Sequence, residues 1–252
     1  MKKNLLIACA LFMLLSSTFA QRKKIAVVTF YTDKHIDYSD IPNSNVTFVA
    51  SMKSLYEDPK FNLKPVLDNF HKAFFAELAK DFPFDFIPEE QVINNEAYKA
   101  YESKWGETKD AEKSKFAQQY ISVDGYKPLI INPLGKKENR NETKMLEIFG
   151  KDVDGVMIVT LDYRFLVKAA VMGMGSAGMY AYARIKLWNK EGDKVFTVNE
   201  RASSDQTVAL ISGIPVTNVD EILPMCESAS KKLLEDLRKR MPKITEKAAK
   251  KL

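Results

Sequence analysis

Four polar side chains that could do chemistry follow the first apolar stretch of the chain. They are Asp33, His35, Asp37 and Asp40. Carboxylate oxygens are the ligands that calcium prefers, and a histidine nitrogen could help to bind zinc. The spacing lacks the glycine and the terminal glutamate of an EF-hand loop, so the sequence predicts no metal site here. It predicts either a ligand-binding loop beyond the first strand or a solvated turn.

A glycine motif at residues 173–178 is the second candidate for chemistry. Its residues, Gly-Met-Gly-Ser-Ala-Gly, match the spacing of a dinucleotide-binding loop. That loop needs a strand before it and a helix after it, because amides at the helix start hold the pyrophosphate. Here an alternating strand follows, so we predict no cofactor and interpret the motif as a flexible inter-strand connection. The segment is apolar for a loop, which favours contact with a partner or a membrane.

The stretch after this motif has the clearest strand pattern in the chain. From Met179 to Trp188, small or aliphatic residues alternate with aromatic or basic ones. Side chains alternate between the two faces of a strand, so one face is predicted to enter the core. The other face is either a contact surface for a ligand or partner, or an ordinary covered or solvent face. The candidate partner-binding residues are Met172, Met174, Met179, Tyr180, Tyr182 and Trp188.

The sequence contains no recognisable catalytic arrangement. A hydrolase needs a nucleophile beside a base. Neither a Gly-x-Ser-x-Gly elbow nor a His-Glu-x-x-His helix is present, and the chain has only 2 histidines. Separated carboxylates could still converge in space, so catalytic residues stay unknown and an enzyme is the less favoured class.

The first 20 residues predict export. Lys2 and Lys3 precede an apolar run, and Ala20 supplies the small residue that signal peptidase accepts. The run is shorter than the roughly 20 residues that cross a bilayer. Residues 1–20 are therefore interpreted as a cleaved signal peptide, and the mature protein is predicted to be periplasmic, outer-membrane-associated or secreted. Its one remaining cysteine, Cys226, lies on the apolar stripe of a predicted helix, so we expect a buried thiol and no internal disulfide.

Charge and composition exclude further classes. Removing Lys2 and Lys3 lowers the formal net charge from +5 to +3, and this small excess does not indicate a nucleic-acid partner. Hydrophobic residues make up 46% of the chain, enough for a full core, so disorder is excluded for most of it.

The hydrophobic pattern of the chain predicts strands and amphipathic helices in mixed order. Strands are predicted at 24–30, 84–87, 156–161 and, as a hairpin, from 179 to 199; helices are predicted at 63–82, 88–101, 138–149 and 220–237, followed by a basic tail. A polar, lysine-rich stretch near 103–137 predicts an insertion. We therefore predict one α/β (α+β) sandwich over residues 21–252, with a mixed sheet, a C-terminal antiparallel meander and helices packed on it.

This order of elements resembles a family of envelope domains. The resemblance rests on the strand 24–30, on Phe74-Phe75-Ala76-Glu77-Leu78, on 84–92, on the strand that begins at 154, and on the hairpin 185–192. The chain is similar here to the curli-secretion lipoprotein and TolB amino-terminal type of domain. The resemblance implies a small α/β sandwich that acts as a binding or assembly module, with no catalytic residues to transfer. The chain departs from it in lacking a usable lipidation cysteine and in carrying residues 103–137.

Together these features predict a non-enzymatic exported protein that binds an envelope protein or a membrane complex. The glycine- and methionine-rich segment and the adjacent hairpin are the predicted contact. The alternative is a secreted ligand-binding protein or hydrolase that uses the loop after the first strand. The partner, the ligand and the oligomeric state stay open.

Overall fold

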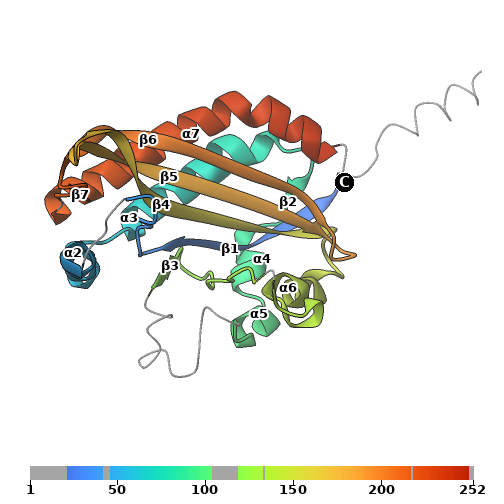
Figure 1. Cartoon of the computed structure of the whole chain (residues 1–252). Coiled ribbons are helices and arrows are strands. Elements are labelled where there is room, and N and C mark those ends of the chain that lie inside the picture. Colours follow the sequence, from blue (N-terminus) through green and yellow to red (C-terminus); the bar gives the residue numbers. More distant parts are fainter. Residues whose placement is uncertain (1–21, 42–45, 104–118, 133, 217, 250–252) are drawn as a thin grey trace, which may run out of the picture.

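The computed structural model describes residues 22–41, 46–103, 119–132, 134–216 and 218–249. Within these residues, seven strands form one mixed sheet in the order β2-β1-β4-β5-β6-β7, with β3 also paired to β1 (Figure 1). The strands are β1 (Lys24–Asp33), β2 (Asp85–Phe86), β3 (Tyr120–Ser122), β4 (Gly155–Val171), β5 (Met174–Asn189), β6 (Lys194–Ile211) and β7 (Ile214–Pro215). The predicted fold class, with its mixed sheet and C-terminal meander, is confirmed. The predicted signal peptide lies outside the described residues.

Six α-helices and three short helical turns complete the described part of the chain. They are α2 (Val46–Glu57), α3 (Lys64–Ala73), the π-turn η1 (Phe74–Leu78), the 3-10 turn η2 (Ala79–Asp81), α4 (Glu89–Ile93), α5 (Glu96–Ala100), the 3-10 turn η3 (Lys137–Asn139), α6 (Asn141–Phe149) and α7 (Val219–Ala249). α2 has no counterpart in the sequence-based prediction. In this part of the chain no helix is both long enough and apolar enough to cross a membrane.

β1 is an interior strand of the sheet and is buried on both faces, as its continuous apolar run predicts. Residues 25–30 are each at most 2% exposed. β1 pairs in parallel with β4 on one edge, while β2 and β3 take only the two ends of its other edge. A register shift between Val27 and Thr29 marks a β-bulge. There the hydroxyl of Tyr98 donates to the carbonyl of Val28 over 2.9 Å and replaces the missing strand partner.

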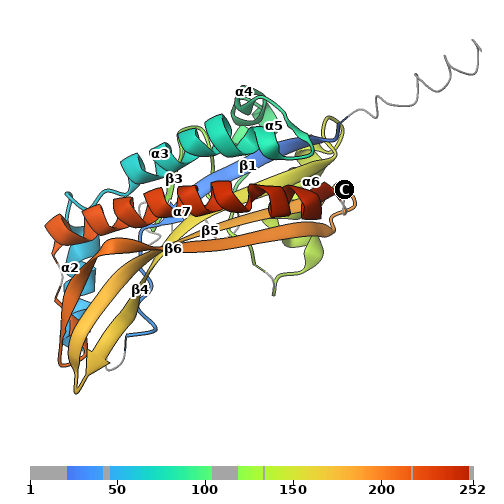
Figure 2. The same ribbon diagram turned by 90° about the horizontal axis from the view of Figure 1, so that it is seen from above.

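α3 and α7 cover one face of the sheet (Figure 2). The helix predicted over 63–82 is present as α3, η1 and η2 in sequence, and α7 extends the predicted C-terminal helix to residue 249. Phe70 and Phe74 pack their rings on Phe30 of β1, with centroids 5.8 and 5.7 Å away. On α7 the stripe that includes Cys226 and Leu233 is fully buried. The expectation of a buried thiol is confirmed, and burial raises the pKa of Cys226.

The meander is longer than predicted. β4, β5 and β6 have 17, 16 and 18 residues, whereas the apolar runs alone predicted short strands. The predicted flexible connection at 173–178 is wrong, because Met174 already begins β5 and only Met172 and Gly173 make the turn. A Cβ on Gly175 would lie 1.9 Å from the carbonyl oxygen of Ala169, so this glycine permits close pairing with β4.

The segments between β2 and β4 lie around β1 on the side away from α7 (Figures 1 and 2). The helix predicted over 88–101 is two helices, because the side chain of Asn95 accepts from the amide of Tyr98 and caps a new one. Residues 104–118 of the predicted insertion lie outside the described residues. Its remainder is not a simple excursion, since β3 pairs with β1 and Leu129 is fully buried.

Candidate functional site

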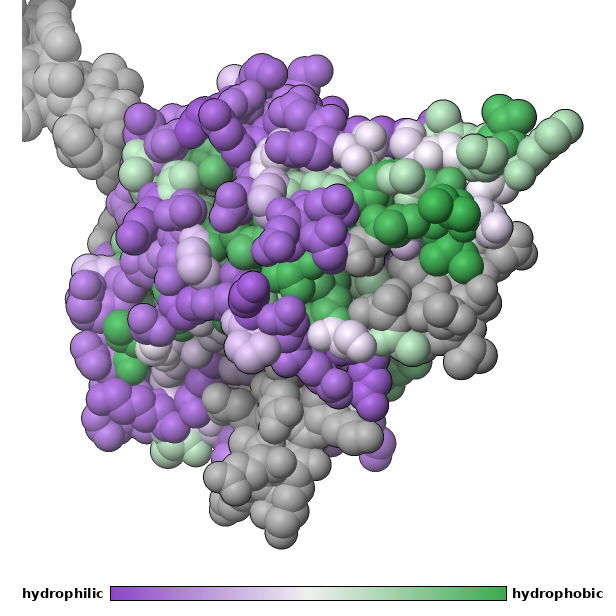
Figure 3. Space-filling model, turned by 90° about the vertical axis from the view of Figure 1, so that its left-hand side faces the viewer, coloured by the Kyte–Doolittle hydropathy of each residue, from purple (hydrophilic) through white to green (hydrophobic). Residues whose placement is uncertain are grey.

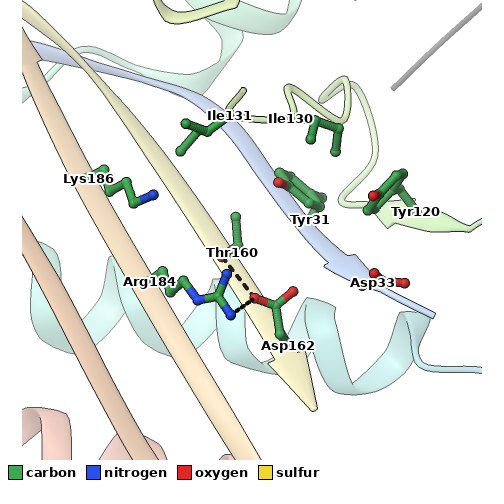
Figure 4. A pocket seen from close by; sticks show the side chains of 9 residues that line it. All are labelled: Tyr31, Asp33, Tyr120, Ile130, Ile131, Thr160, Asp162, Arg184 and Lys186. Carbon is green, nitrogen blue, oxygen red and sulfur yellow. Dashed lines mark hydrogen bonds and ion pairs between the residues drawn. The ribbon is translucent and has the colours of Figure 1, made fainter. Parts of the chain in front are cut away.

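A small hollow lies on the face of the sheet opposite α3 and α7, near the carboxyl end of β1 and beside the first half of β4 (Figure 4). Its volume is about 190 Å³. The hollow is lined by Tyr31, Asp33, Tyr120, Ile130, Ile131, Thr160, Asp162, Arg184 and Lys186. Ligand sites in sheets with parallel strands often lie beyond the carboxyl ends of those strands.

Strand register brings these residues together. Tyr31 of β1 is paired with Thr160 of β4, which is in turn paired with Arg184 of β5. Residues two positions apart on a strand share a face, so Asp33, Asp162 and Lys186 join the same surface. The polar face that the alternation of β5 predicted is therefore one wall of the hollow.

Burial disfavours the charged form of both carboxylates in the hollow. It raises the pKa of Asp33 to about 6, against hydrogen bonds from the amide of His35 and the side chain of Gln119 that lower it. Burial also raises the pKa of Asp162, although the guanidinium of Arg184, 3.5 Å away, opposes this shift. Thr160 donates to Asp162 over 3.5 Å. Asp162 and Arg184 thus neutralise each other.

Three polar groups of the hollow have no hydrogen-bond or ion-pair partner among the described residues. They are the hydroxyls of Tyr31 and Tyr120 and the ammonium of Lys186. Tyr31 is only 6% exposed, and its pKa is raised, chiefly by burial. Burial lowers the pKa of Lys186, and the nearby charges of Arg184 and Lys194 lower it further. These two hydroxyls and this ammonium are therefore available to bond to a ligand or to water that enters the hollow.

The loop that follows β1 does not bring its four candidate residues together. Asp33 lines the hollow, whereas the ring of His35 lies 4.5 Å from that of Tyr56. Asp37 and Asp40 instead form ion pairs with Arg164 at 2.6 and 3.1 Å. Within the described residues no three His, Cys, Asp or Glu side chains are arranged to hold a metal ion.

Several residues of the hollow were not among the predicted site residues. Tyr31, Thr160 and Asp162 belong to apolar strands, and only the fold shows that they face a common space. Arg184 and Lys186 had a usable signal, because they lie on the polar face of the best-patterned strand. Asp162 directly follows the predicted strand 156–161, and the pairing of Thr32 with Leu161 places it beside Asp33.

A second candidate site is the end of the meander. Two turns meet there, Met172–Gly173 and Ser212–Gly213, all four residues with positive φ. The amide of Gly213 donates to the carbonyl of Gly173 over 2.7 Å and holds the turns side by side. We call this surface the hairpin end and define it by its exposed apolar side chains Val171, Met172, Met174, Ile211 and Val216, which are 52–101% exposed. Figure 3 shows hydrophobic side chains gathered on this side of the molecule.

The hairpin end is uncharged over two long stretches. Residues 169–183 and 206–219 contain no Asp, Glu, Lys or Arg, in a chain of which 28% is charged. Exposed apolar surface without charge is typical of interaction sites. The two stretches therefore converge on one surface suited to contact with another molecule.

The structure separates the predicted partner-binding residues. Met172 and Met174 lie on the hairpin end, whereas Met179 is 0% and Trp188 5% exposed. Those two side chains are buried in the core and cannot meet a partner in this fold. Tyr180 and Tyr182 are half-buried on the same side of β5 as the hollow, and the guanidinium of Arg164 lies 5.5 Å from the ring centre of Tyr182.

Comparisons with known proteins identify no family. No protein-family model and no curated protein matches the sequence. Among solved structures, a hypothetical protein from Chlamydia trachomatis is similar with a TM-score of 0.33 and 8% identity, over 87% of this chain and 95% of that one. A lipoprotein from Neisseria meningitidis is similar with a TM-score of 0.25 and 14% identity, over 85% of this chain and 99% of that one. Similarities this low do not define a family for the chain.

Proposed function

We propose that this is a non-enzymatic exported protein of the cell envelope, which binds a partner protein through the hairpin end. The observation that carries the proposal is the convergence of the two charge-free stretches on an exposed apolar surface. Met172 and Met174 are 101% and 70% exposed. Methionine side chains are flexible and polarizable, and they adapt well to a partner's surface. The export signal predicted at residues 1–20 supports a contact in the envelope.

The charges around the hairpin end favour a protein partner over a lipid surface. Binding to anionic lipid is strengthened by clustered lysine and arginine. The first charge-free stretch begins after Lys168 and the second lies between Asp205 and Asp220, whereas Arg184, which ends the first stretch, lies in the hollow. The charged residues that flank the hairpin end in the described part of the chain therefore do not form a basic cluster.

The test is the double variant Met172→Asp with Met174→Asp. Met172 has a φ of 50°, a conformation that aspartate tolerates, so the variant should fold. The matched control is Leu134→Asp, because Leu134 is 94% exposed outside the hairpin end. Both proteins should keep the wild-type melting temperature.

The partner is captured by cross-linking in intact cells and identified, and its affinity is measured with purified components. Burying a methionine stabilises a complex by about 1.5–3 kcal/mol, so the double variant should bind at least about tenfold more weakly, while the control should not. Equal binding by the double variant and the wild type refutes the proposal. The wild type and both variants are also sedimented with phosphatidylglycerol vesicles. If only the double variant fails to sediment with the vesicles, lipid is the target and the proposal of a protein partner is refuted.

A further inference from the structure

We propose that the hollow between β1, β3, β4 and β5 binds a small hydroxylated carboxylate, a hydroxy acid with a single negative charge. This site lies on the sheet face and shares no residue with the hairpin end. The proposal is therefore independent of the proposed contact with a partner. It rests on the unpartnered groups of the hollow, on its charge balance and on its size.

The basic side chains define where the carboxylate binds. Arg184 is matched by Asp162, which leaves the ammonium of Lys186 without an ion-pair partner among the described residues. A half-buried ammonium beside a guanidinium is unfavourable, since each charge repels the other and burial removes water, and the carboxylates of Glu142 and Asp162 offset only part of this cost. A carboxylate bound between Lys186 and Arg184 would remove this repulsion with charge-assisted hydrogen bonds.

The remaining polar groups suit hydroxyls on the ligand. The hydroxyls of Tyr31 and Tyr120 can each donate or accept a hydrogen bond. Tyr31 is almost fully buried, so only a group within the hollow can reach its hydroxyl. The carboxylate of Asp33 accepts one bond from His35 and one from Gln119, and it has lone pairs left for a ligand hydroxyl.

Charge and volume narrow the ligand class further. The two cations of the hollow, Arg184 and Lys186, share it with two carboxylates, Asp33 and Asp162, and only Lys186 of the two cations has no ion pair among the described residues, so a second negative charge on the ligand would meet Asp33 and Asp162 with no cation to pair with. An ammonium group is a weaker candidate than a hydroxyl, because Asp162 is already paired with Arg184 and Asp33 already accepts two hydrogen bonds, whereas an ammonium needs acceptors for three N–H groups. The volume of about 190 Å³ is below the roughly 300–1,000 Å³ of pockets that take drug-sized molecules. Ile130 and Ile131 supply apolar contact for a short carbon chain.

The experiment measures binding of glycerate to the mature full chain by calorimetry. Glycerol serves as the matched compound without the carboxylate, and serine as the matched compound with an ammonium in place of a hydroxyl. Gluconate and sorbitol form a longer pair of the same kind. Inorganic phosphate tests for an anion site without a hydroxyl requirement.

Lys186→Met removes the unpaired charge and keeps the length of the side chain. Lys194→Met is the control for a through-space effect of charge, because exposed Lys194 lies outside the hollow but its charge acts on Lys186. Tyr31→Phe removes only a hydroxyl. Unfolding in the absence of ligand shows that each variant is folded, and Lys186→Met should be no less stable than the wild type, since the fold disfavours the charged ammonium.

We expect glycerate or gluconate to bind and glycerol and sorbitol not to bind. Lys186→Met should weaken binding at least about tenfold and Tyr31→Phe severalfold, whereas Lys194→Met and the double variant of the hairpin end should bind as the wild type does. The proposal is overturned if neither acid binds, if phosphate or serine binds as tightly, or if Lys186→Met binds as tightly as Lys194→Met.

Discussion

Tyr98→Phe tests how the structure closes the edge of β1 beside the hollow. The hydroxyl of Tyr98 donates to the carbonyl of Val28 and accepts from the amide of Lys127, both over 2.9 Å. The carbonyl of Lys127 in turn accepts from the hydroxyl of Thr29 over 2.5 Å. One buried hydroxyl therefore joins the β-bulge of β1 to the segment that leads to Ile130.

Phenylalanine fills the same space but leaves two backbone groups without this partner. Val28 is 0% exposed and Tyr98 is also 0% exposed, so water has no direct access at this point. A buried polar group that loses its partner costs about 1–3 kcal/mol. With two groups affected, one of them in the half-buried residue Lys127, we expect a loss of about 2–4 kcal/mol in the free energy of unfolding.

The assay is urea unfolding followed by fluorescence, with amide hydrogen exchange as a second readout. Tyr56→Phe is the matched control, because the hydroxyl of Tyr56 serves one backbone group, the carbonyl of Ile36, over 2.9 Å. That control should lose about 1 kcal/mol. The amide of Lys127 should exchange faster in Tyr98→Phe alone. If Tyr98→Phe is no less stable than Tyr56→Phe, the bridging role assigned to this hydroxyl is wrong.

Two further perturbations test the charges around the site. Burial raises the pKa of Asp33 from 3.8 to about 6, so its contribution to stability is present below about pH 4 and is lost as the pH rises through 6. Asp33→Asn should remove this loss and stabilise the protein at pH 7 by up to about 3 kcal/mol. If the urea midpoints of the wild type and of Asp33→Asn differ by the same amount at every pH from 4 to 8, this expectation is wrong. Arg164→Met should lower the free energy of unfolding by about 1 kcal/mol, since the ion pairs of Arg164 with Asp37 and Asp40 are partly exposed. It should also speed hydrogen exchange of the Asp37 amide, which donates to the carbonyl of Tyr163. Unchanged exchange would show that these ion pairs do not hold the loop.

The periodic parts of the chain were determined by sequence alone. The apolar run in β1, the alternation in β5 and the stripe on α7 each describe the burial of a side chain relative to its neighbours in the chain. That relation follows from the repeat of a strand or helix, so no tertiary information is needed. The two candidate regions, the segment around Met174 and the residue Asp33, were also visible because their composition differs from their surroundings.

Tertiary structure decided how far the strands extend and which side chains meet. β4 and β5 continue past their apolar runs because the backbone of each strand forms hydrogen bonds with the backbone of the other. Backbone pairing of this kind does not depend on side-chain type, so the sequence pattern does not reveal it. For the same reason the insertion near 103–137 looked polar and unstructured although β3 adds to the sheet.

The hollow could not be derived from the sequence. Asp33 meets Asp162 and Arg184 because β1, β4 and β5 pair in one register, and a shift by one residue would send each side chain to the opposite face. The hairpin end likewise required Gly173 and Gly213 to lie side by side, since either turn alone exposes only a few apolar side chains. Local pattern thus determined which residues are buried, whereas strand register determined which residues form a site.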